Sequence, residues 1–313
     1  MEFKILIISI LLSTLVAPLI QLIFLKYKIF DPINQRSSHS VLATRTGGLA
    51  CFSVFFLISI YFYLFEYEVY DFSLLIPLSI MFIIGVYDDF YDANFKLKFL
   101  IQIIVCKILI DQGLVIDNFY GIFNLYEIPR ISSQLFTVFV FLVIVNSINF
   151  IDGIDGLGLT EIIKILTIFL VINYQNNSKL YLGLVIISSL IPLYFYNFKK
   201  QNKIFLGDGG SLFLGTLISV YTFGLLNSDF QLPFSFNKPL LSILILLYPL
   251  IDLLRVFIIR VSNRKSPFYP DNNHLHHFLL RKKINHWKIS IILPFGFLLL
   301  SFFIGFLIKT ISE

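Results

Sequence analysis

Ten apolar runs alternate with nine polar connections along this chain of 313 residues. A helix that crosses a bilayer needs roughly 20 mostly apolar residues, and the runs reach or approach this length. They lack the strict apolar/polar alternation of barrel strands, and lipid leaves helices and closed barrels as the only spanning structures. The pattern predicts an all-α polytopic integral membrane protein with about ten transmembrane helices, near residues 3–25, 47–65, 72–87, 97–116, 134–151, 157–175, 179–198, 211–226, 239–260 and 288–308.

The limits of the runs carry further information. The runs at 72–87 and 211–226 are short for a bilayer, so we expect their true ends to lie inside the adjacent polar motifs. The first run is long and has no clear small-residue cleavage site, which favours a retained helix over a signal peptide. Because no stretch has the composition of a soluble domain, residues 1–313 are predicted to form a single membrane-embedded domain.

The composition agrees with a membrane protein. Hydrophobic residues make up 57% of the chain and charged residues 14%, whereas a soluble domain has about 25% charged residues. The two cysteines, Cys51 and Cys106, lie inside apolar runs. This position favours small buried hydrophobic side chains over a disulfide or a zinc site.

Charge is divided unevenly between the connections. The odd-numbered connections carry all five histidines and most of the lysines and arginines. Since positively charged loops stay in the cytoplasm, these connections are predicted to be cytoplasmic and both termini extracytoplasmic. The acidic turn from Glu66 to Asp71 then falls outside, as this topology requires. Part of the positive charge could be topology signal alone, but the polar motifs all gather on one face, as expected of an active site at a membrane surface.

The densest polar motif follows the fifth run. Asn146, Asn149 and Asp152 recur every third residue, so a helix places them on one side. The glycines that follow Asp152 and Asp155 let the backbone leave the helix or approach a ligand closely. Two amides and two carboxylates at the end of a membrane helix are costly unless they bind something. The structural alternative is a helix cap with turn residues.

A second acidic motif, Asp88, Asp89 and Asp92, follows the third run. Asp88 and Asp92 are four residues apart and share a helical face, whereas Asp89 points elsewhere. Unpaired, these carboxylates repel one another, and a bound Mg²⁺ would relieve that repulsion, since Mg²⁺ takes one or two carboxylates together with substrate phosphates. The cluster also supplies a candidate base or nucleophile. A solvated helix end is the structural alternative.

Asp208 lies in a glycine-rich segment, residues 207–211, at the start of the eighth run. Glycine-rich backbone at a helix N-terminus suits anions, but Asp208 would repel a phosphate unless a cation lies between them. The segment also lacks the lysine of a P-loop. These features favour Asp208 as a metal ligand over a phosphate cradle, with an N-cap turn as the structural alternative.

The last cytoplasmic connection concentrates histidines at His274, His276 and His277. Their spacing could suit zinc, but no cysteine or acidic ligand pair is arranged around them. Together with nearby arginines and lysines, they could instead donate hydrogen bonds to diphosphate oxygens. A histidine run at the surface is the structural alternative.

The first connection carries Arg36, His39 and Arg45. On its own this basic loop fits substrate contact and a topology signal equally well. Three acids lie within apolar runs, where each would need a partner. Basic residues one helical turn away offer such partners, in the pairs Lys107–Asp111, Glu161–Lys164 and Asp252–Arg255.

Taken in this order, the motifs resemble the polyprenyl-phosphate N-acetylhexosamine-1-phosphate transferase family (glycosyltransferase family 4). That family includes the initiators of O-antigen and enterobacterial common antigen synthesis and the phospho-MurNAc-pentapeptide translocase. The resemblance spans residues 31–277 and rests on four separate motifs. The segment Arg36–His39, and the interruption of the histidines by Leu275, look more like the O-antigen initiators, because the translocases carry three consecutive histidines.

The resemblance implies a ten- or eleven-helix fold, a Mg²⁺ cofactor with Mn²⁺ as the alternative ion, a cytoplasmic UDP-N-acetylhexosamine site and an undecaprenyl phosphate acceptor. The lipid bilayer is a further expected partner, and no nucleic acid is expected to bind. Whether the protein forms a homodimer is left open. By position in the motifs, it implies catalysis for Asp88 and Asp89, metal binding for Asn149 and Asp208, and substrate binding for Asp152, Asp155, His274, His276, His277, Arg36, His39 and Arg45.

Two positions depart from the family's pattern. Thr44 stands where a proline usually precedes the arginine of the first loop, and Asn272 stands where an arginine often follows the aspartate of the last motif. The second change puts a specific sugar contact in the last loop in doubt.

In the implied reaction, an oxygen of the lipid phosphate attacks the β-phosphorus of the UDP-sugar, and UMP leaves. The product, undecaprenyl-diphosphate-sugar, would initiate O-antigen or another cell-surface polysaccharide at the inner membrane of a bacterium. A two-step route through a phosphoenzyme is also open, as is the sugar: GlcNAc, GalNAc, QuiNAc or FucNAc. The peptidoglycan translocase is the nearest alternative. A transporter would place its ionisable groups near the bilayer midplane, and a scaffold would leave the one-sided clustering unexplained.

Overall fold

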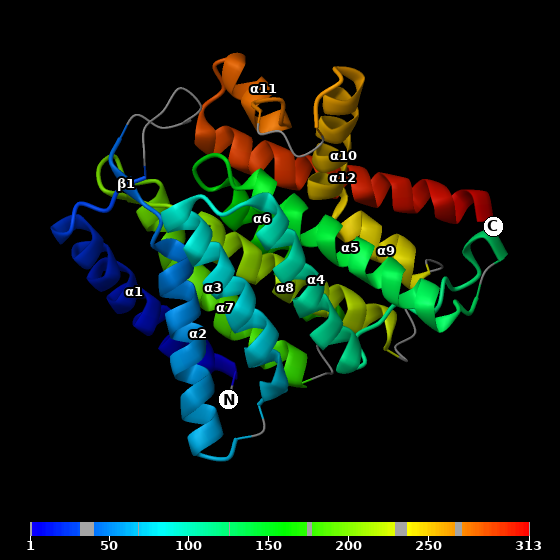
Figure 1. Cartoon of the computed structure of the whole chain (residues 1–313), viewed down its shortest axis with the longest axis horizontal. Helices are drawn as coiled ribbons and strands as arrows, with labels where there is room; N and C mark the ends of the chain where they lie inside the picture. The colour runs from blue at the N-terminus through cyan, green and yellow to red at the C-terminus, as the bar shows by residue number, and fades with distance from the viewer. Residues whose placement is uncertain are drawn as a thin grey trace.

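The computed structural model describes residues 2–31, 41–67, 69–124, 126–173, 177–228, 237–266 and 271–312. Within these ranges the regular structure is helical apart from one pair of two-residue strands. The prediction of an all-α protein is thus confirmed. The helices (Figure 1) are α1 (Glu2–Lys26), α2 (Gly47–Leu64), α3 (Leu75–Tyr91), α4 (Phe95–Asp111), α5 (Arg130–Ile151), α6 (Leu157–Ile172), α7 (Asn177–Asn197), α8 (Gly207–Leu226), α9 (Lys238–Ile245), α10 (Leu247–Ser262), α11 (Leu275–Arg281) and α12 (His286–Ser312), with the 3-10 turns η1 (Phe72–Leu74) and η2 (Ile122–Asn124).

Seven of the described helices are long and apolar enough to cross a membrane, and the pair α9–α10, bent by 75°, adds an eighth if it counts as one span. Each of the ten predicted runs coincides with one helix or, for residues 239–260, with this bent pair. α4 and α6 have 17 and 16 residues, short of the roughly 20 that a bilayer requires. The polytopic membrane character is therefore confirmed, and the count of ten stays a prediction.

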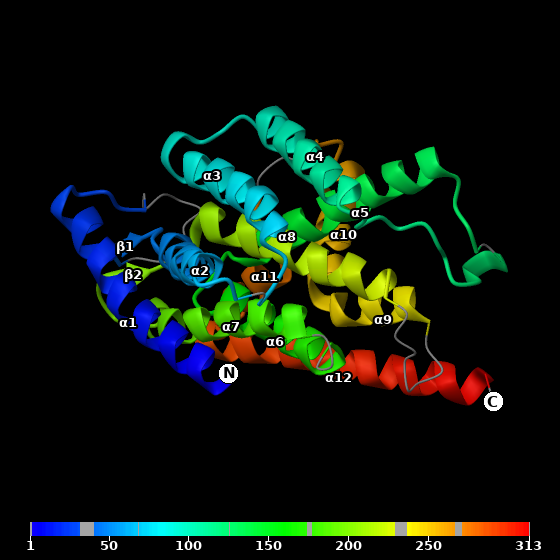
Figure 2. The same ribbon diagram turned by 90° about the horizontal axis from the view of Figure 1, so that it is seen from below.

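α8 lies at the centre of the bundle (Figures 1 and 2). Every residue in Gly209–Leu226 is buried, and α2, α3 and α5 pack against this helix. Two glycines permit the close approach. A Cβ on Gly48 of α2 would collide with the backbone of Gly210, and a Cβ on Gly85 of α3 would collide with the backbone of Asp208. The first turn of α8 is therefore enclosed by two neighbouring helices.

A short parallel sheet ties the first connection to the segment before α8. β1 (Ala43–Thr44) pairs with β2 (Lys203–Ile204). The pairing continues into α2, where the N–H of Gly47 donates to the carbonyl oxygen of Phe205 at 2.8 Å. Arg45, which lies between β1 and α2, is thereby held beside the N-terminus of α8.

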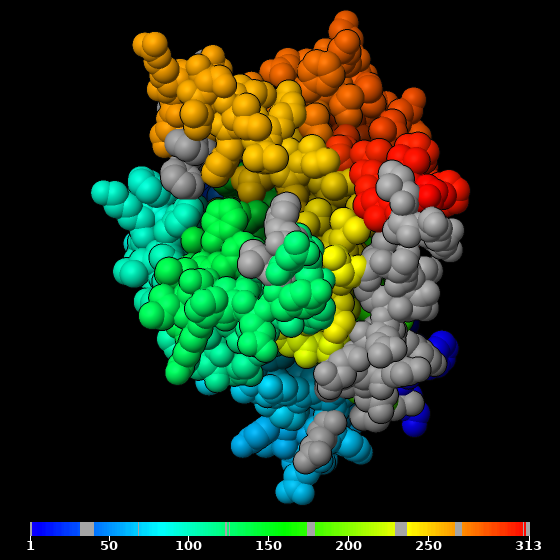
Figure 3. Space-filling view, turned by 90° about the vertical axis from the view of Figure 1, so that its right-hand side faces the viewer, coloured from blue at the N-terminus to red at the C-terminus, as the bar shows by residue number. Residues whose placement is uncertain are grey.

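The outward faces of the peripheral helices are apolar. On α1, Leu11, Leu15 and Leu19 are more than half exposed, as are Leu299 and Phe302 on α12. Large apolar side chains exposed in this way mark a surface that meets lipid or another apolar partner. Figure 3 shows the C-terminal part of α12 beside α9 and α10 on one such side of the molecule.

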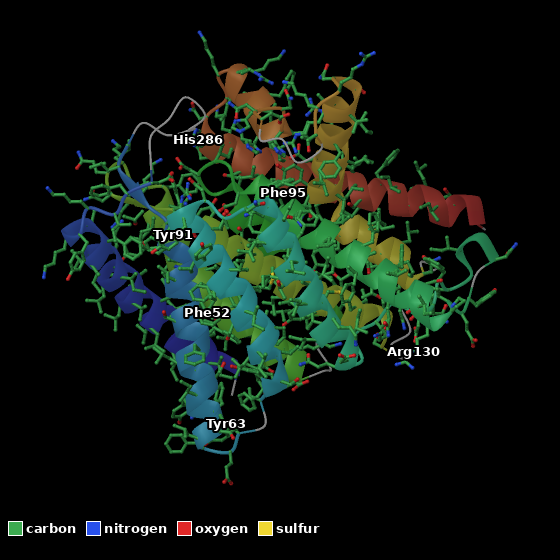
Figure 4. All side chains as sticks on the ribbon, viewed as in Figure 1. Phe52, Tyr63, Tyr91, Phe95, Arg130 and His286 are labelled. Carbon is green, nitrogen blue, oxygen red and sulfur yellow. The ribbon has the colours of Figure 1, made fainter. Side chains whose placement is uncertain are left out.

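The polar motifs lie at one end of the bundle. Figure 4 places Tyr91, Phe95 and His286 at this end, with Tyr63 and Arg130 far from them. α3 and α5 end here, and α4, α8 and α12 begin here. The motifs therefore share one face of the molecule, as the alternation of runs and connections predicts.

Candidate active site

Three helix ends meet at the acidic motifs. α3 carries Asp88 and Asp89 in its last turn, α8 carries Asp208 in its first turn, and α5 carries Asn149 in its last turn. The two short runs thus extend into their motifs, as their length predicts. The four side chains expected to serve catalysis and metal binding are together in one place.

Asp89 caps the N-terminus of α8. Its Oδ1 accepts a hydrogen bond from the backbone N–H of Asp208, and its Oδ2 accepts one from Gly209, each at 3.0 Å. The free N–H groups and the positive end of the helix dipole stabilise a carboxylate here. Arg45 adds positive charge, with Nη1 at 3.4 Å from Oδ1 of Asp89 and Nη2 at 2.6 Å from Asp31. The anion site suggested by the glycine-rich segment is therefore occupied by the protein's own carboxylate.

Asp88 faces Lys98 and Asp208. Nζ of Lys98 lies 2.5 Å from Oδ2 of Asp88 and 3.9 Å from Oδ2 of Asp208. The N–H of Ala93 donates to Oδ1 of Asp88 at 2.8 Å, and the carboxyl groups of Asp88 and Asp208 lie within hydrogen-bond reach of each other. One ammonium group thus faces two carboxylates, which leaves an excess of negative charge.

Asp92 does not share this environment. α3 ends at Tyr91, and Asp92 follows in the left-handed conformation, with φ 48° and an exposed side chain. The prediction that Asp88 and Asp92 lie on one helical face is wrong, because the helix ends one residue before Asp92. The carboxylate partner of Asp88 comes from α8 instead.

Asn149 joins α5 to this cluster. Its Nδ2 donates to Oδ1 of Asp208 at 2.9 Å and to Oγ of Ser211 at 2.8 Å. Within the described ranges, no three histidine, cysteine or carboxylate side chains converge as metal ligands. Asp88 and Asp208, with an amide and a hydroxyl beside them, still form an oxygen-rich donor set, and Mg²⁺ commonly uses one or two carboxylates and completes its shell with water and phosphate. The excess negative charge between the two carboxylates fits such an ion.

The loop between α5 and α6 contributes two carboxylates in different environments. Burial among protein atoms and the nearby Asp89 carboxylate raise the pKa of Asp152 to about 7. Asp155 pairs through Oδ2 with Lys203, and the same oxygen lies 3.0 Å from Nδ1 of His286. Burial alone would raise the pKa of Asp155, but these two partners outweigh it and lower that pKa. At neutral pH Asp155 is charged, whereas Asp152 can exchange a proton.

α10 holds the start of the histidine segment. Oδ2 of Asp252 lies 2.7 Å from Nδ1 of His274, and its Oδ1 accepts the N–H of Leu275 at 2.8 Å. Arg255, one turn later, donates to the carbonyl oxygen of Asn273. The prediction that Asp252 pairs with Arg255 is wrong, because each binds this segment instead. The other two pairs predicted within runs are present, Lys107–Asp111 and Glu161–Lys164.

Arg260 makes a second anchor further along α10. Its Nε and Nη2 contact the two carboxylate oxygens of Asp271 at 3.1 and 3.2 Å, so the pair is bidentate. The guanidinium also lies over the ring of Phe150 in α5, 5.8 Å from its centroid. The histidine segment is thereby attached to α10 and placed near the end of α5.

His276 is buried against the loop between α5 and α6, where a Cβ on Gly153 would collide with its ring. Neither ring nitrogen of His276 has a hydrogen-bond partner among the described residues. Burial and the neighbouring His274 lower the pKa of His277 to about 4, and burial with His277 beside it also lowers the pKa of His276 well below its usual range. At neutral pH both rings are uncharged, so each can donate one hydrogen bond but adds no positive charge.

The predicted residues divide into two adjoining clusters. Asp88, Asp89, Asn149 and Asp208 lie with Arg45 around the start of α8, and Asp155 lies with His286 at the start of α12. Asp152 lies between them, near enough to Asp89, Arg45 and Asp155 to feel their charges. Arg36 and His39 lie outside the described residues. Sequence reasoning missed Lys98, Lys203 and His286, since no short spacing connects them to the motifs. Asp31, at which the resemblance begins, and Asp252, which was expected to pair with Arg255, were not predicted to take part in the site.

Comparison with known proteins identifies the family. Residues 72–225 match glycosyl transferase family 4. The chain is 32% identical over 301 residues to the probable undecaprenyl-phosphate N-acetylglucosaminyl 1-phosphate transferase of Bacillus subtilis (strain 168), an alignment that covers 93% of this chain and 81% of that protein. This multi-pass membrane protein with an acidic site at its helix ends therefore belongs to glycosyl transferase family 4.

Two further relatives have closely related names. The undecaprenyl-phosphate alpha-N-acetylglucosaminyl 1-phosphate transferase of Pasteurella multocida (strain Pm70) is 28% identical over 286 residues, covering 87% of this chain and 76% of the relative. The protein of the same name from Escherichia coli (strain K12) is 26% identical over 264 residues, covering 82% and 70%. The similarity thus extends over most of each protein.

Proposed function

We propose that this protein transfers N-acetylglucosamine 1-phosphate from UDP-GlcNAc to undecaprenyl phosphate and releases UMP. The observation that carries the proposal is the cluster of Asp88, Lys98, Asp208 and Asn149, where the ends of α3, α4, α5 and α8 meet. The names of the relatives support the same reaction. A polar site at the end of a lipid-facing bundle suits one substrate from the bilayer and one from water.

The reaction is a phosphoryl transfer between two anions. An oxygen of the lipid phosphate attacks the β-phosphorus of UDP-GlcNAc and forms a new P–O bond. The bond from that phosphorus to the bridging oxygen breaks, and UMP leaves with the electron pair. Positioning and stabilisation of charge supply most of the catalysis in such transfers. A phosphoenzyme route would instead release UMP without any lipid acceptor.

We assign the acceptor phosphate to Asp88 rather than to Asp89. Both oxygens of Asp89 already accept backbone N–H groups of α8, so its role is to hold the start of α8. Oδ2 of Asp88 contacts the ammonium of Lys98. That ammonium can pair with an arriving phosphate, which frees Asp88 to orient the phosphate or accept its proton.

We propose further that Asp208 and Asn149 hold Mg²⁺, or Mn²⁺ in its place, beside Asp88. Bound there, the ion would supply positive charge to the diphosphate of UDP-GlcNAc. His274, His276 and His277 are assigned to hydrogen bonds with the same diphosphate, and Asp152 and Asp155 to the nucleotide. Arg36, His39 and Arg45 are assigned to further substrate contacts.

The proposed topology has ten spans with both termini extracytoplasmic. The site then lies on the cytoplasmic face of the bacterial inner membrane, where UDP-sugars are available. The basic residues near the site, among them Lys98, Lys203 and Arg260, agree with the excess of positive charge on cytoplasmic loops. A cysteine placed at the exposed Lys200 should therefore react with a membrane-impermeant reagent in inverted vesicles and not in intact cells.

The purified protein, supplied with undecaprenyl phosphate, tests the function against a panel of UDP-N-acetylhexosamines. We expect UMP release with UDP-GlcNAc, matched by a lipid product whose mass equals undecaprenyl-diphosphate-GlcNAc. Turnover with UDP-MurNAc-pentapeptide instead would assign the protein to the peptidoglycan translocases. Release of UMP in the absence of lipid would support the phosphoenzyme route, and no lipid diphosphate with any sugar would refute the proposal.

A further inference from the structure

Asp155 is the point at which three separate segments meet. Its Oδ2 pairs with Lys203 of β2 and lies 3.0 Å from Nδ1 of His286, the first residue of α12. The side chains of Lys203, His286 and Asp155 are 12%, 24% and 7% exposed. The contacts are therefore largely shielded from water, which makes each of them stronger than an ion pair at the surface.

The loop that carries Asp155 has a second attachment to the same strand. The N–H of Gly156 donates to Oδ1 of Asn197 at 2.6 Å, and Nδ2 of Asn197 donates to the carbonyl oxygen of Ile204 at 2.9 Å. Asn197 is buried. The backbone of the loop is thus fixed through the end of α7, while the carboxylate of Asp155 is fixed by Lys203 and His286.

The second oxygen of Asp155 has no such partner. Its Oδ1 is buried and accepts no hydrogen bond from the residues that the structure describes. A buried acceptor without a donor is unfavourable, and such groups mark places where a water or a ligand completes the arrangement. A hydroxyl or N–H of a nucleotide is a donor of the required kind.

We infer that Lys203 and His286 are positioning residues, which hold the Asp155 carboxylate so that Oδ1 is presented to the nucleotide half of the substrate. The inference rests on the proposed function for the identity of that substrate. Nδ1 of His286 donates to Oδ2 of Asp155 when it carries a proton, and only in its other tautomer could it accept the N–H of Asp155, which lies 3.4 Å away. Neither Lys203 nor His286 belongs to the motifs singled out from the sequence.

Binding of UDP to the purified protein in lipid nanodiscs, measured by calorimetry, tests this directly. Lys203→Gln and His286→Phe should each weaken UDP binding about tenfold, the loss expected for one hydrogen bond to a charged group. Lys203→Arg and His286→Asn should recover most of the affinity, since each again offers a polar group to the carboxylate. Lys200→Gln, which removes a charge from an exposed lysine nearby, should leave the affinity unchanged.

Two further measurements separate positioning from a general loss of structure. The KM for undecaprenyl phosphate should stay the same in both variants while the KM for UDP-GlcNAc rises. In an Asp155→Asn background, Lys203→Gln should weaken UDP binding little further, because the two residues act through one carboxylate. Equal shifts in both KM values, additive effects, or variants that match the Lys200→Gln control would overturn the inference alone. A wild-type protein that binds no UDP would overturn the proposed function as well.

Discussion

Asp88 and Asp89 are adjacent in sequence but make different contacts, and replacing each by asparagine separates their roles. An asparagine at position 89 has one acceptor oxygen for two backbone N–H groups, those of Asp208 and Gly209. The change removes a charge-assisted hydrogen bond worth about 1.5–3 kcal/mol and leaves a buried N–H unpaired at a cost of about 1–3 kcal/mol. Asp89→Asn should therefore destabilise the fold by about 3 kcal/mol or more.

Asp88→Asn has a different balance. The amide oxygen can still accept the N–H of Ala93. The ion pair with Lys98 is lost, but so is the repulsion that Asp88 exerts on the carboxylate of Asp208. The two changes oppose each other, so the stability should change little. Turnover should nevertheless fall, because Asp88 is assigned to the acceptor phosphate.

Thermal unfolding in detergent micelles and turnover under one set of conditions check both variants together. Asp89→Asn should unfold several degrees below the wild type, whereas Asp88→Asn should unfold near the wild-type temperature and turn over poorly. Equal unfolding temperatures for the two variants, or a less stable Asp88→Asn, would refute the assignment of Asp89 as the cap of α8.

Three other outcomes follow from the same contacts. Asp252→Asn should lower kcat/KM for UDP-GlcNAc about tenfold by loosening His274, and an unchanged kcat/KM would contradict that attachment. Gly48→Ala should lower the thermal stability, because the methyl group collides with α8, whereas Gly296→Ala meets open space and should not. Folding raises the pKa of Asp152 from 3.8 to about 7. The stability that this side chain contributes is therefore fully present below pH 3.8 and is lost as the pH rises to about 7. Asp152→Asn should accordingly be more stable than the wild type above pH 7, measured by thermal unfolding, with no gain at acid pH.

Periodicity and length predicted the helices well because, in lipid, a long apolar run without barrel-strand alternation can satisfy its backbone hydrogen bonds only as a helix. The same reasoning placed the ends of α3 and α8 inside their motifs, where Asp89 and Asp208 now meet. It failed at Asp92, because helix periodicity was extended past the residue at which α3 ends. The apolar pattern also did not predict the bend between α9 and α10, because the two helices together form one apolar run.

The site was predicted in part, since its motifs are dense but their partners are distant. Lys98 lies just inside an apolar run, ten residues after Asp88, and only the turn between α3 and α4 brings them together. Asp252 had a plausible partner in Arg255 one helical turn away, yet it binds His274, which is 22 residues further along the chain. Spacing along the chain cannot show whether a side chain pairs with a residue one helical turn away or with a distant residue that the tertiary fold brings close. His286 was missed for the same reason.

Parallel measurement of UMP release and lipid product by the wild type and Asp208→Asn, across a range of Mg²⁺ concentrations, tests the proposed site most directly. The wild type should give one UMP per undecaprenyl-diphosphate-GlcNAc, should stop when EDTA is added and should resume when Mg²⁺ is restored. Asp208→Asn should remain folded, because Asn149 and Ser211 keep a polar partner there, and should be inactive at every Mg²⁺ concentration. Undiminished turnover in EDTA, or an Asp208→Asn variant as active as the wild type, would contradict a metal-dependent transfer at this cluster.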